Sequence, residues 1–352
     1  MVYKKRRDYE EIEIYDDGMD RKVSKKLFIK QKNPESIGVV RTPAKLLHFY
    51  SYRVKKVTYL AVQPLNFKAD AMGEPIVVDS VVRKVNESYS DYQVKVSDDR
   101  QKVLVYKFLF RLGKVEEISS AVLDTRELTI KRTGLDVTGL SRQMKFLQAL
   151  ISNEGHIFYV SQNDYERPGA KEGLPMFLIH ANYGVGDSMQ LHQINDTTFK
   201  FGEARFSLDN LNQKLVAAGL YSNGNVHEVT GVFYYQFDMA TKRFETAQFS
   251  QFSDQLVTDM LGQAKKRNVL EANYVIRDVV VRYDGGVLVM AEYRNENTES
   301  YQHTNYDPYY GYRTSTEYVD YYNFEDVMVL SLTPAGGCLL YTSDAADDRS
   351  WV

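Results

Sequence analysis

Apolar and polar positions recur along the chain in a fixed order. A polar turn precedes a short apolar strand, and a second apolar strand follows after an excursion. Short runs rich in Val, Ile, Leu, Tyr and Phe, bounded by Asp, Asn and Gly, predict β-strands. Five such pairs are found, at residues 46–49 with 59–62, 103–106 with 121–124, 157–160 with 176–179, 215–219 with 232–238, and 287–291 with 327–332.

The spacing of these pairs predicts the architecture. The first strands begin at Leu46, Val103, Ile157, Leu215 and Val287, so the steps between them are 57, 54, 58 and 72 residues. Units of several strands at nearly even spacing are typical of propeller blades. A β-sandwich is the rival arrangement, but it gives no reason for even spacing. We therefore expect an all-β β-propeller fragment of about five blade units, whose inner strands are covered on both faces.

Two insertions interrupt the repeat. Residues 253–272 begin with Ser253 and Asp254 at plausible N-cap positions and continue with apolar residues at helical spacing, which predicts a short helical insertion. We expect its apolar stripe to pack on the chain's own propeller, the alternative being a helix that binds a partner. Residues 301–323 form a polar, tyrosine-rich excursion between the last two predicted strands.

The last fifteen residues differ in character from the rest. The run from Cys338 to Asp347 resembles a translated transposase adapter, the synthetic DNA joined to fragments when sequencing libraries are prepared. We therefore predict that 338–352 is a non-native tail and that residues 1–337 form a single, incomplete β-propeller domain. On this interpretation the strand at 327–332 has an unpaired edge, which favours aggregation.

Composition excludes several classes of protein. The chain has 44 basic and 47 acidic residues, or 43 and 44 without the tail. Because these charges nearly cancel, we expect no nucleic-acid partner. Cys338 is the only cysteine, so residues 1–337 have no disulfide, thiolate zinc site or cysteine nucleophile. No apolar run approaches the ~18 residues of a membrane helix. No signal peptide follows Met1.

Residues 1–337 resemble a family of uncharacterised β-propeller proteins from Bacteroidetes-type bacteria. The resemblance implies an exported protein, periplasmic or extracellular, with a signal peptide absent from this chain and further sequence after Gly337. The family has no agreed activity to transfer. The segments that carry the resemblance are Asp98-Asp99 before 103–106, residues 215–222 and 231–234, Asp278 before Val279, and the tyrosine-rich stretch followed by 326–329.

The tyrosine-rich excursion is the leading candidate for a binding site. Tyrosine combines an apolar ring with a hydroxyl group, which suits contact with a sugar or a protein. The alternative is an extended hairpin whose tyrosines pair across strands and cover neighbouring blades. The candidate binding residues are Tyr301, Tyr306, Tyr309, Tyr310, Tyr312 and Arg313.

Titratable residues give weaker signals. The paired acidic residues fall at turns of the repeat, where backbone geometry explains them better than a glycosidase carboxylate pair does. The segment 16–20 lacks the glutamate that closes a calcium loop. The histidines are scattered, and none is expected to form a metal pair. The acidic residues at turns are Asp16, Asp17, Asp98, Asp99, Asp209 and Asp284, and the histidines are His48, His156, His180, His192, His227 and His303.

The sequence thus favours a non-catalytic binding or interaction propeller, with a protein or glycan ligand and no cofactor or metal. The alternative is a propeller enzyme acting on glycans or peptides. An enzyme is expected to gather two carboxylates, or a carboxylate and a histidine, around one deep pocket. A binding module is expected to present an exposed aromatic surface instead.

Overall fold

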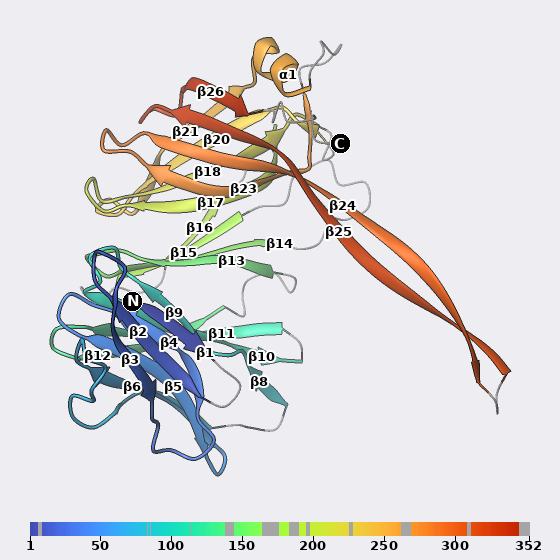
Figure 1. Cartoon of the computed structure of the whole chain (residues 1–352). Coiled ribbons are helices and arrows are strands. Elements are labelled where there is room, and N and C mark those ends of the chain that lie inside the picture. The colour runs from blue at the N-terminus through green and yellow to red at the C-terminus, as the bar shows by residue number, and fades with distance from the viewer. Residues whose placement is uncertain are drawn as a thin grey trace. The chain divides into compact units, whose positions relative to one another are not determined.

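The computed structural model describes residues 1–5, 9–82, 84, 86–112, 114–137, 144–163, 176–182, 190–194, 198–224, 228–261, 269–307 and 311–344. Within these ranges the chain is almost entirely antiparallel β-structure, with one helix, α1 (Asp254–Leu261) (Figure 1). The backbone divides into two compact units. The first comprises residues 1–166 and 176–194, and the second comprises residues 167–175 and 195–352.

The first unit contains four antiparallel sheets, and in all but one the strands follow chain order. A small sheet consists of β1 (Val2–Lys5), β2 (Glu10–Tyr15) and β3 (Arg21–Leu27). The second consists of β4 (Glu35–Arg41), β5 (Leu46–Val54), β6 (Val57–Leu65) and β7 (Ile76–Val82). In the third, β10 (Lys102–Arg111), β11 (Lys114–Asp124) and β12 (Ile130–Asp136) are joined at the β10 edge by two short strands, β8 (Glu87–Tyr89) and β9 (Gln93–Val96). The fourth consists of β13 (Met144–Ile151), β14 (His156–Asn163), β15 (Met176–Asn182) and β16 (Gln190–Ile194).

The second unit contains two four-stranded sheets and a short two-stranded one. The first comprises β17 (Lys200–Asp209), β18 (Lys214–Ser222), β20 (Gly231–Asp238) and β21 (Arg243–Gln251). The other comprises β23 (Tyr274–Val281), β24 (Val287–Asp307), β25 (Gly311–Leu332) and β26 (Cys338–Asp344). The two-stranded sheet pairs β19 (Glu228–Val229) with β22 (Leu270–Glu271).

The five predicted strand pairs are confirmed as the two inner strands of five blade-like sheets. They correspond to β5 and β6, β10 and β11, β14 and β15, β18 and β20, and β24 and β25. Each sheet is a meander of antiparallel strands, as in the blades of a propeller. The predicted fold class, all-β of propeller type, is therefore confirmed. The extent predicted for the domain, residues 1–337, stays a prediction.

The packing within the first unit explains why the inner strands are continuously apolar. Alternate residues of β10 point to opposite faces of its sheet. Val103 and Val105 lie in a core shared with β5 and β6, whereas Leu104 and Tyr106 lie in a core shared with β14 and β15. Each inner strand is thus buried on both faces, and the alternation of polar and apolar residues is lost.

The helical insertion is shorter than predicted. Leu256, Val257 and Met260 of α1 are buried against strands of the second unit, as expected, and the Leu256 amide donates to the Ser253 hydroxyl group at 3.2 Å, which confirms the N-cap. The helix ends at Leu261, and residues 262–268 lie outside the described ranges. Leu270 is extended rather than helical, because it pairs with β19.

The two strands predicted to flank the tyrosine-rich excursion continue through it. Beyond the sheet, β24 and β25 extend as a two-stranded ribbon, paired from Arg294 with Phe324 to Asp307 with Gly311 (Figure 1). At the other end of β25, residues 327–332 pair with β26, so the expected unpaired edge is not present. Residues 338–344, which the sequence analysis predicts to be a foreign tail, supply this fourth strand, and their leucines, tyrosine and threonine are compatible with an extended conformation.

Candidate functional site

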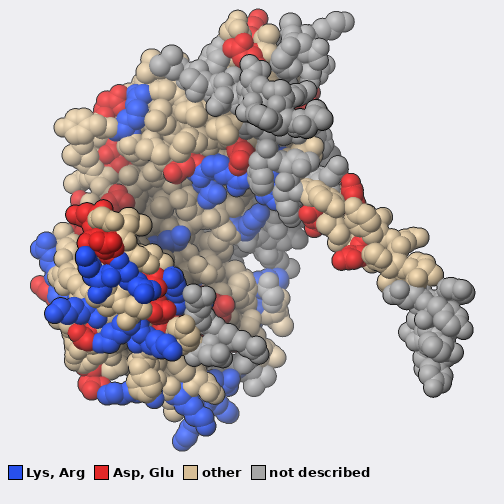
Figure 2. All heavy atoms as spheres, viewed as in Figure 1, with Lys and Arg blue, Asp and Glu red and all other residues tan. Residues whose placement is uncertain are grey.

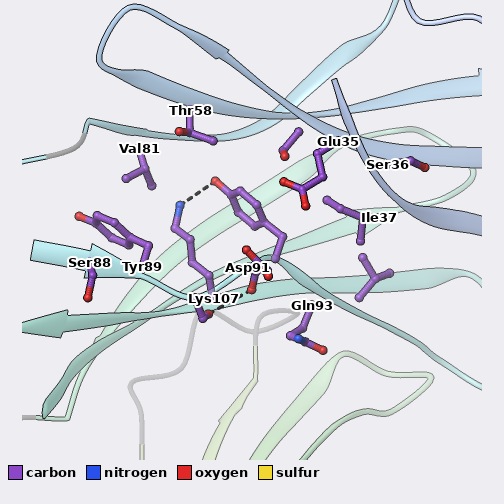
Figure 3. A pocket seen from close by; sticks show the side chains of 14 residues that line it. Glu35, Ser36, Ile37, Thr58, Val81, Ser88, Tyr89, Asp91, Gln93 and Lys107 are labelled. Atoms are coloured by element: carbon purple, nitrogen blue, oxygen red, sulfur yellow. Dashed lines mark hydrogen bonds between the residues drawn. The ribbon is translucent and has the colours of Figure 1, made fainter. Parts of the chain in front are cut away.

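A cavity of about 660 Å³ lies between the second and third sheets of the first unit (Figure 3). Its walls come from β4, β5, β6 and β7 on one side, and from β8, β9, β10 and the β8–β9 connection on the other. The lining residues share a polar character, with hydroxyl, carboxylate and phenol groups predominating. They are Glu35, Ser36, Ile37, Ser51, Thr58, Val81, Ser88, Tyr89, Ser90, Asp91, Tyr92, Gln93, Val94 and Lys107.

A bulge in the edge strand shapes this cavity. Tyr89 pairs with Leu109, and Gln93 pairs with Tyr106, so three residues of the edge (90–92) oppose two residues of β10. Ser90 bridges the break, since its amide donates to the Phe108 carbonyl and its hydroxyl group accepts from the Phe108 amide, both at 2.9 Å. An extra residue bends a strand and redirects its side chains. Here it places residues 91 and 92 in the cavity wall.

The floor of the cavity contains a buried lysine in a hydrogen-bonded cluster. Lys107 interrupts the apolar run of β10, and only 1% of its surface is exposed. Its ammonium group donates to the Asp79 carboxylate and to the Tyr92 hydroxyl group, each at 2.7 Å. The Tyr92 hydroxyl group in turn donates to the same Asp79 oxygen at 2.9 Å. The cluster therefore connects β7 of one sheet to β10 and the bulge of the next.

Two tyrosine rings complete the surroundings of this lysine. The Lys107 nitrogen lies 4.4 Å from the ring centre of Tyr92 and 5.3 Å from that of Tyr89, and the Tyr89 ring is seen beside the lysine in Figure 3. Such rings attract a cation through their quadrupole. One carboxylate and two rings thus compensate the charge of Lys107, which accordingly acts as an internal tether between the two sheets.

Burial shifts the protonation equilibria of the cluster. Loss of water lowers the pKa of Lys107, and the Asp79 carboxylate opposes that change. Burial also raises the pKa of Tyr92 far above its ordinary value of 10, and the negative charge of Asp79 adds to the effect. Tyr92 is therefore a neutral phenol that can donate or accept a hydrogen bond, and it is not suited to act as a base.

The open side of the cavity presents two carboxylates. Glu35 and Asp91 both line the cavity, and Figure 3 shows their side chains there. Within the described ranges no Lys, Arg or His forms an ion pair with either. Because Asp79 already compensates the charge of Lys107, Glu35 and Asp91 give the cavity a negative character.

Those predicted binding residues that the structure describes lie on the ribbon, not at this cavity. Tyr301 is on β24, with 40% of its surface exposed; its hydroxyl group donates to Glu299 and lies 2.9 Å from the Tyr321 hydroxyl group. Tyr306 pairs with Tyr312, and Asn305 with Arg313, along the backbone, while the side chains of Tyr306, Tyr312 and Arg313 lie outside the description. Tyr309 and Tyr310 lie outside the described ranges.

The acidic residues at turns behave as predicted. Asp99 accepts hydrogen bonds from the Ser97 hydroxyl group and the Gln101 amide, and Asp209 accepts from the Asn212 amide. Asp284 accepts from the Gly286 amide. These carboxylates stabilise the turns of their sheets, which accounts for their recurrence in the sequence.

The histidines are less scattered than predicted. His156 Nδ1 lies 2.9 Å from His180 Nε2, because β14 and β15 are adjacent strands. The sequence separation concealed this pairing. No group of three His, Cys, Asp or Glu residues suited to a metal ion occurs in the part of the chain that the structure describes.

One histidine contacts both a serine and a carboxylate, but in the wrong geometry for a hydrolase. Ser36 Oγ and Glu10 Oε2 lie 2.9 and 3.2 Å from the same nitrogen of His48, Nε2. A catalytic triad needs the carboxylate on the other ring nitrogen, where it orients the base. Tyr3 also contacts the Ser36 hydroxyl group, at 2.8 Å. These contacts attach β1 and β2 to the adjacent sheet.

Comparison with known proteins shows no close relative. No family model matches the chain, and no curated protein matches it either. Among solved structures, a polysaccharide lyase is 8% identical, with a TM-score of 0.42, over 92% of this chain and 86% of its own. A protein from Lactobacillus plantarum is 12% identical, with a TM-score of 0.37, over 68% of this chain and 64% of its own.

An exo-β-1,3-galactanase from Phanerochaete chrysosporium is 7% identical, with a TM-score of 0.31, over 76% of this chain and 57% of its own. The chain thus spans less than two thirds of the Lactobacillus protein and of the galactanase. At such identities and TM-scores the likeness assigns neither an activity nor a substrate to this chain. Within the described ranges no helix is both long and apolar enough to cross a membrane.

Proposed function

We propose that the protein binds a glycan in the cavity between its second and third sheets, as a binding module of propeller type. The proposal rests on the lining of the cavity. Hydroxyl groups, two carboxylates and two tyrosine rings surround a volume of about 660 Å³. That volume is typical of sites for small ligands. Hydroxyl and carboxylate groups match the many hydroxyl groups of a sugar, and a tyrosine ring suits the apolar face of a sugar.

The charge of the site defines the class of glycan. Glu35 and Asp91 face the cavity, whereas the charge of Lys107 is compensated inside the cluster by Asp79. A uronate or sulfated sugar would bring a negative charge near these carboxylates, which is unfavourable. The proposed ligand is therefore a neutral oligosaccharide.

Calorimetric titration tests this proposal. Neutral hexasaccharides of glucose, xylose and galactose are compared with an oligogalacturonate of the same length. At least one neutral probe is expected to bind, and the uronate is expected to bind at least tenfold more weakly. Tyr89→Ala is expected to weaken binding at least tenfold. Tyr283→Ala, which truncates a tyrosine that is 90% exposed elsewhere, is the matched control. Absence of binding to every neutral probe by the folded protein would overturn the proposal.

A second candidate function, glycan cleavage, is favoured by the two carboxylates at one cavity. Glycoside hydrolysis uses a pair of carboxyl groups on opposite sides of the bond. The test is incubation of the bound oligosaccharide, labelled at its reducing end, with the protein and with Glu35→Gln and Asp91→Asn. Cleavage that either substitution abolishes, while binding is retained, identifies an enzyme. Binding without cleavage identifies a binding module.

Export completes the proposal. The resemblance stated for residues 1–337 implies a periplasmic or extracellular location, where oligosaccharides of this kind are met. Fractionation of the source cells, with an antibody against this chain, tests it. Recovery from the cytoplasm alone would count against export without affecting the binding result.

A further inference from the structure

The ribbon formed by β24 and β25 has an outer edge that is open for pairing. From residue 295 to residue 307, β24 pairs with β25 on one side, while its other side meets no strand within the described ranges. Such an edge presents a row of backbone donors and acceptors. Proteins commonly protect an exposed edge with lysine or proline, and residues 294–307 contain neither.

The residues that the structure describes provide no covering layer for the ribbon. A two-stranded hairpin is only marginally stable in water, and stability requires further strands or a packed face. Tyr301, Tyr318 and Tyr321 have 40%, 70% and 42% of their surfaces exposed. Along the ribbon, Figure 2 shows acidic side chains among uncharged ones. A strand added at the β24 edge supplies the missing neighbour.

We propose that a second copy of this chain supplies that strand, so that two β24 edges pair antiparallel about a two-fold axis at Tyr301. This register places Glu299 opposite the partner's His303, and His303 opposite the partner's Glu299. Both residues lie on the same face of β24 as Tyr301, because residues two apart share a face. Opposite charges or hydrogen-bonding groups directly across a strand pair stabilise it.

The side chains of Glu299 and His303 can each form one more hydrogen bond in addition to their contacts within the ribbon. Glu299 accepts a hydrogen bond from the Tyr301 hydroxyl group at 2.5 Å, and a carboxylate has two oxygens. His303 Nε2 lies 3.4 Å from Glu317, and an imidazole has a second nitrogen. With 58% of its side chain exposed, His303 is accessible to a partner. Each contact within the ribbon can therefore persist in the dimer.

Charge favours this register over those with the axis at residue 299 or 303, and it favours this edge over the other. A two-fold axis at Glu299 would place Glu299 opposite the same residue of the second copy. A two-fold axis at His303 would place Glu299 opposite Asp307 of the second copy. Like charges directly opposite are destabilising. On β25, residues 314–326 include four acidic residues and no basic one, so two copies of that edge repel each other. The β24 edge centred on Tyr301 is the complementary one.

Cysteine cross-linking tests the register. In a Cys338→Ser background, which removes the only cysteine, Tyr301→Cys brings two thiols opposite each other on the axis, within the ~4.5–5.5 Å between facing Cβ atoms. Mild oxidation is expected to convert most of the protein to a covalent dimer. Thr298→Cys is the matched control, because its copies are separated by six residues, or about 20 Å. Equal cross-linking at both positions would overturn the proposed register.

Charge reversal tests the contact independently. Sedimentation equilibrium is expected to show dimer formation by the unmodified chain and about tenfold weaker association for Glu299→Lys or His303→Glu alone. The double variant is expected to restore association, since lysine then faces glutamate. The proposal is overturned if the unmodified chain stays monomeric, even if an extended peptide binds to this edge instead. It is also overturned if the chain forms a dimer that neither substitution weakens.

Discussion

At the residue scale, Lys107 has the strongest consequences. A lysine in an inner strand interrupts an apolar run, and the structure compensates its charge with Asp79, Tyr92 and Tyr89. Burying a charge without a partner is costly, and breaking a buried pair costs more than replacing the whole pair. Removing one member of the pair is therefore expected to cost more stability than replacing both members together.

We expect Asp79→Asn to reduce the free energy of unfolding by about 3 kcal/mol, because it leaves the Lys107 ammonium group buried without a carboxylate. The double substitution Asp79→Leu with Lys107→Met removes both charges, and it is expected to cost about 1 kcal/mol or less. Urea unfolding of both variants measures the difference. Equal costs would contradict the description of the cluster as a compensated buried cation.

Acid stability depends on a second lysine–carboxylate pair. The Lys214 ammonium group lies 2.5 Å from Asp238, and this contact, with the Thr241 amide, lowers the pKa of Asp238 from 3.8 to about 2. A lowered pKa means that the ionised form is stabilised in the folded state. This contribution is complete above pH 4 and is lost as the pH falls from 4 towards 2.

Asp238→Asn is accordingly expected to flatten the dependence of stability on pH between 4 and 2. Lys214→Met is expected to do the same, because it removes the partner that favours ionisation. Thermal unfolding at a series of pH values checks both variants. If each kept the full acid dependence of the unmodified chain, another carboxylate would have to account for it.

At the scale of elements, the bulge and the ribbon show how departures from a regular blade create surfaces. The extra residue between β8 and β9 opens the cavity, and the continuation of β24 and β25 beyond their sheet forms the ribbon. The bulge also contributes Tyr92 to the buried cluster, whereas the ribbon contributes nothing to the core of its blade. The ribbon can therefore be altered with little effect on folding.

Shortening the ribbon tests this independence. Replacing residues 297–321 with Asn-Gly joins Glu296 to Tyr322, which already pair, and Asn-Gly suits a two-residue hairpin turn. At a protein concentration too low for dimer formation, the melting temperature is expected to stay within about 2 °C of the unmodified chain, because within one chain the removed residues pair only with each other. A large decrease would mean that the ribbon supports the blade.

The inner strands could be predicted from sequence, whereas the outer strands and the cavity could not. Burial on both faces leaves a continuous apolar run, as in β10, and such runs are visible in a single sequence. Outer strands such as β3 and β21 are half exposed, and their mixed composition conceals them. The bulge at 90–92 depends on register across β10, which no local pattern encodes. Lys107 itself was the available signal, as a charge within an apolar run.

At the scale of the whole molecule, the blade formed by β23, β24, β25 and β26 depends on its outermost strand. β26 covers the edge of β25 from residue 327 to residue 332. Deleting residues 338–352 leaves that edge unpaired and is expected to lower the melting temperature and promote aggregation. Deleting only residues 345–352 retains β26 and serves as the control. Light scattering during heating measures the aggregation of both deletion variants. If both aggregate at the same temperature, β26 has no structural role.

Because Lys107 is buried, its chemical modification can be used to detect unfolding of the first unit. An amine reacts with an acylating reagent only when it is unprotonated and accessible, and with 1% of its surface exposed Lys107 is not accessible. Exposed lysines such as Lys22 acquire the label while the chain is folded. Lys107 becomes modified only when its two sheets separate. Its labelling rate, read by peptide mass spectrometry, therefore measures how often the first unit opens under native conditions.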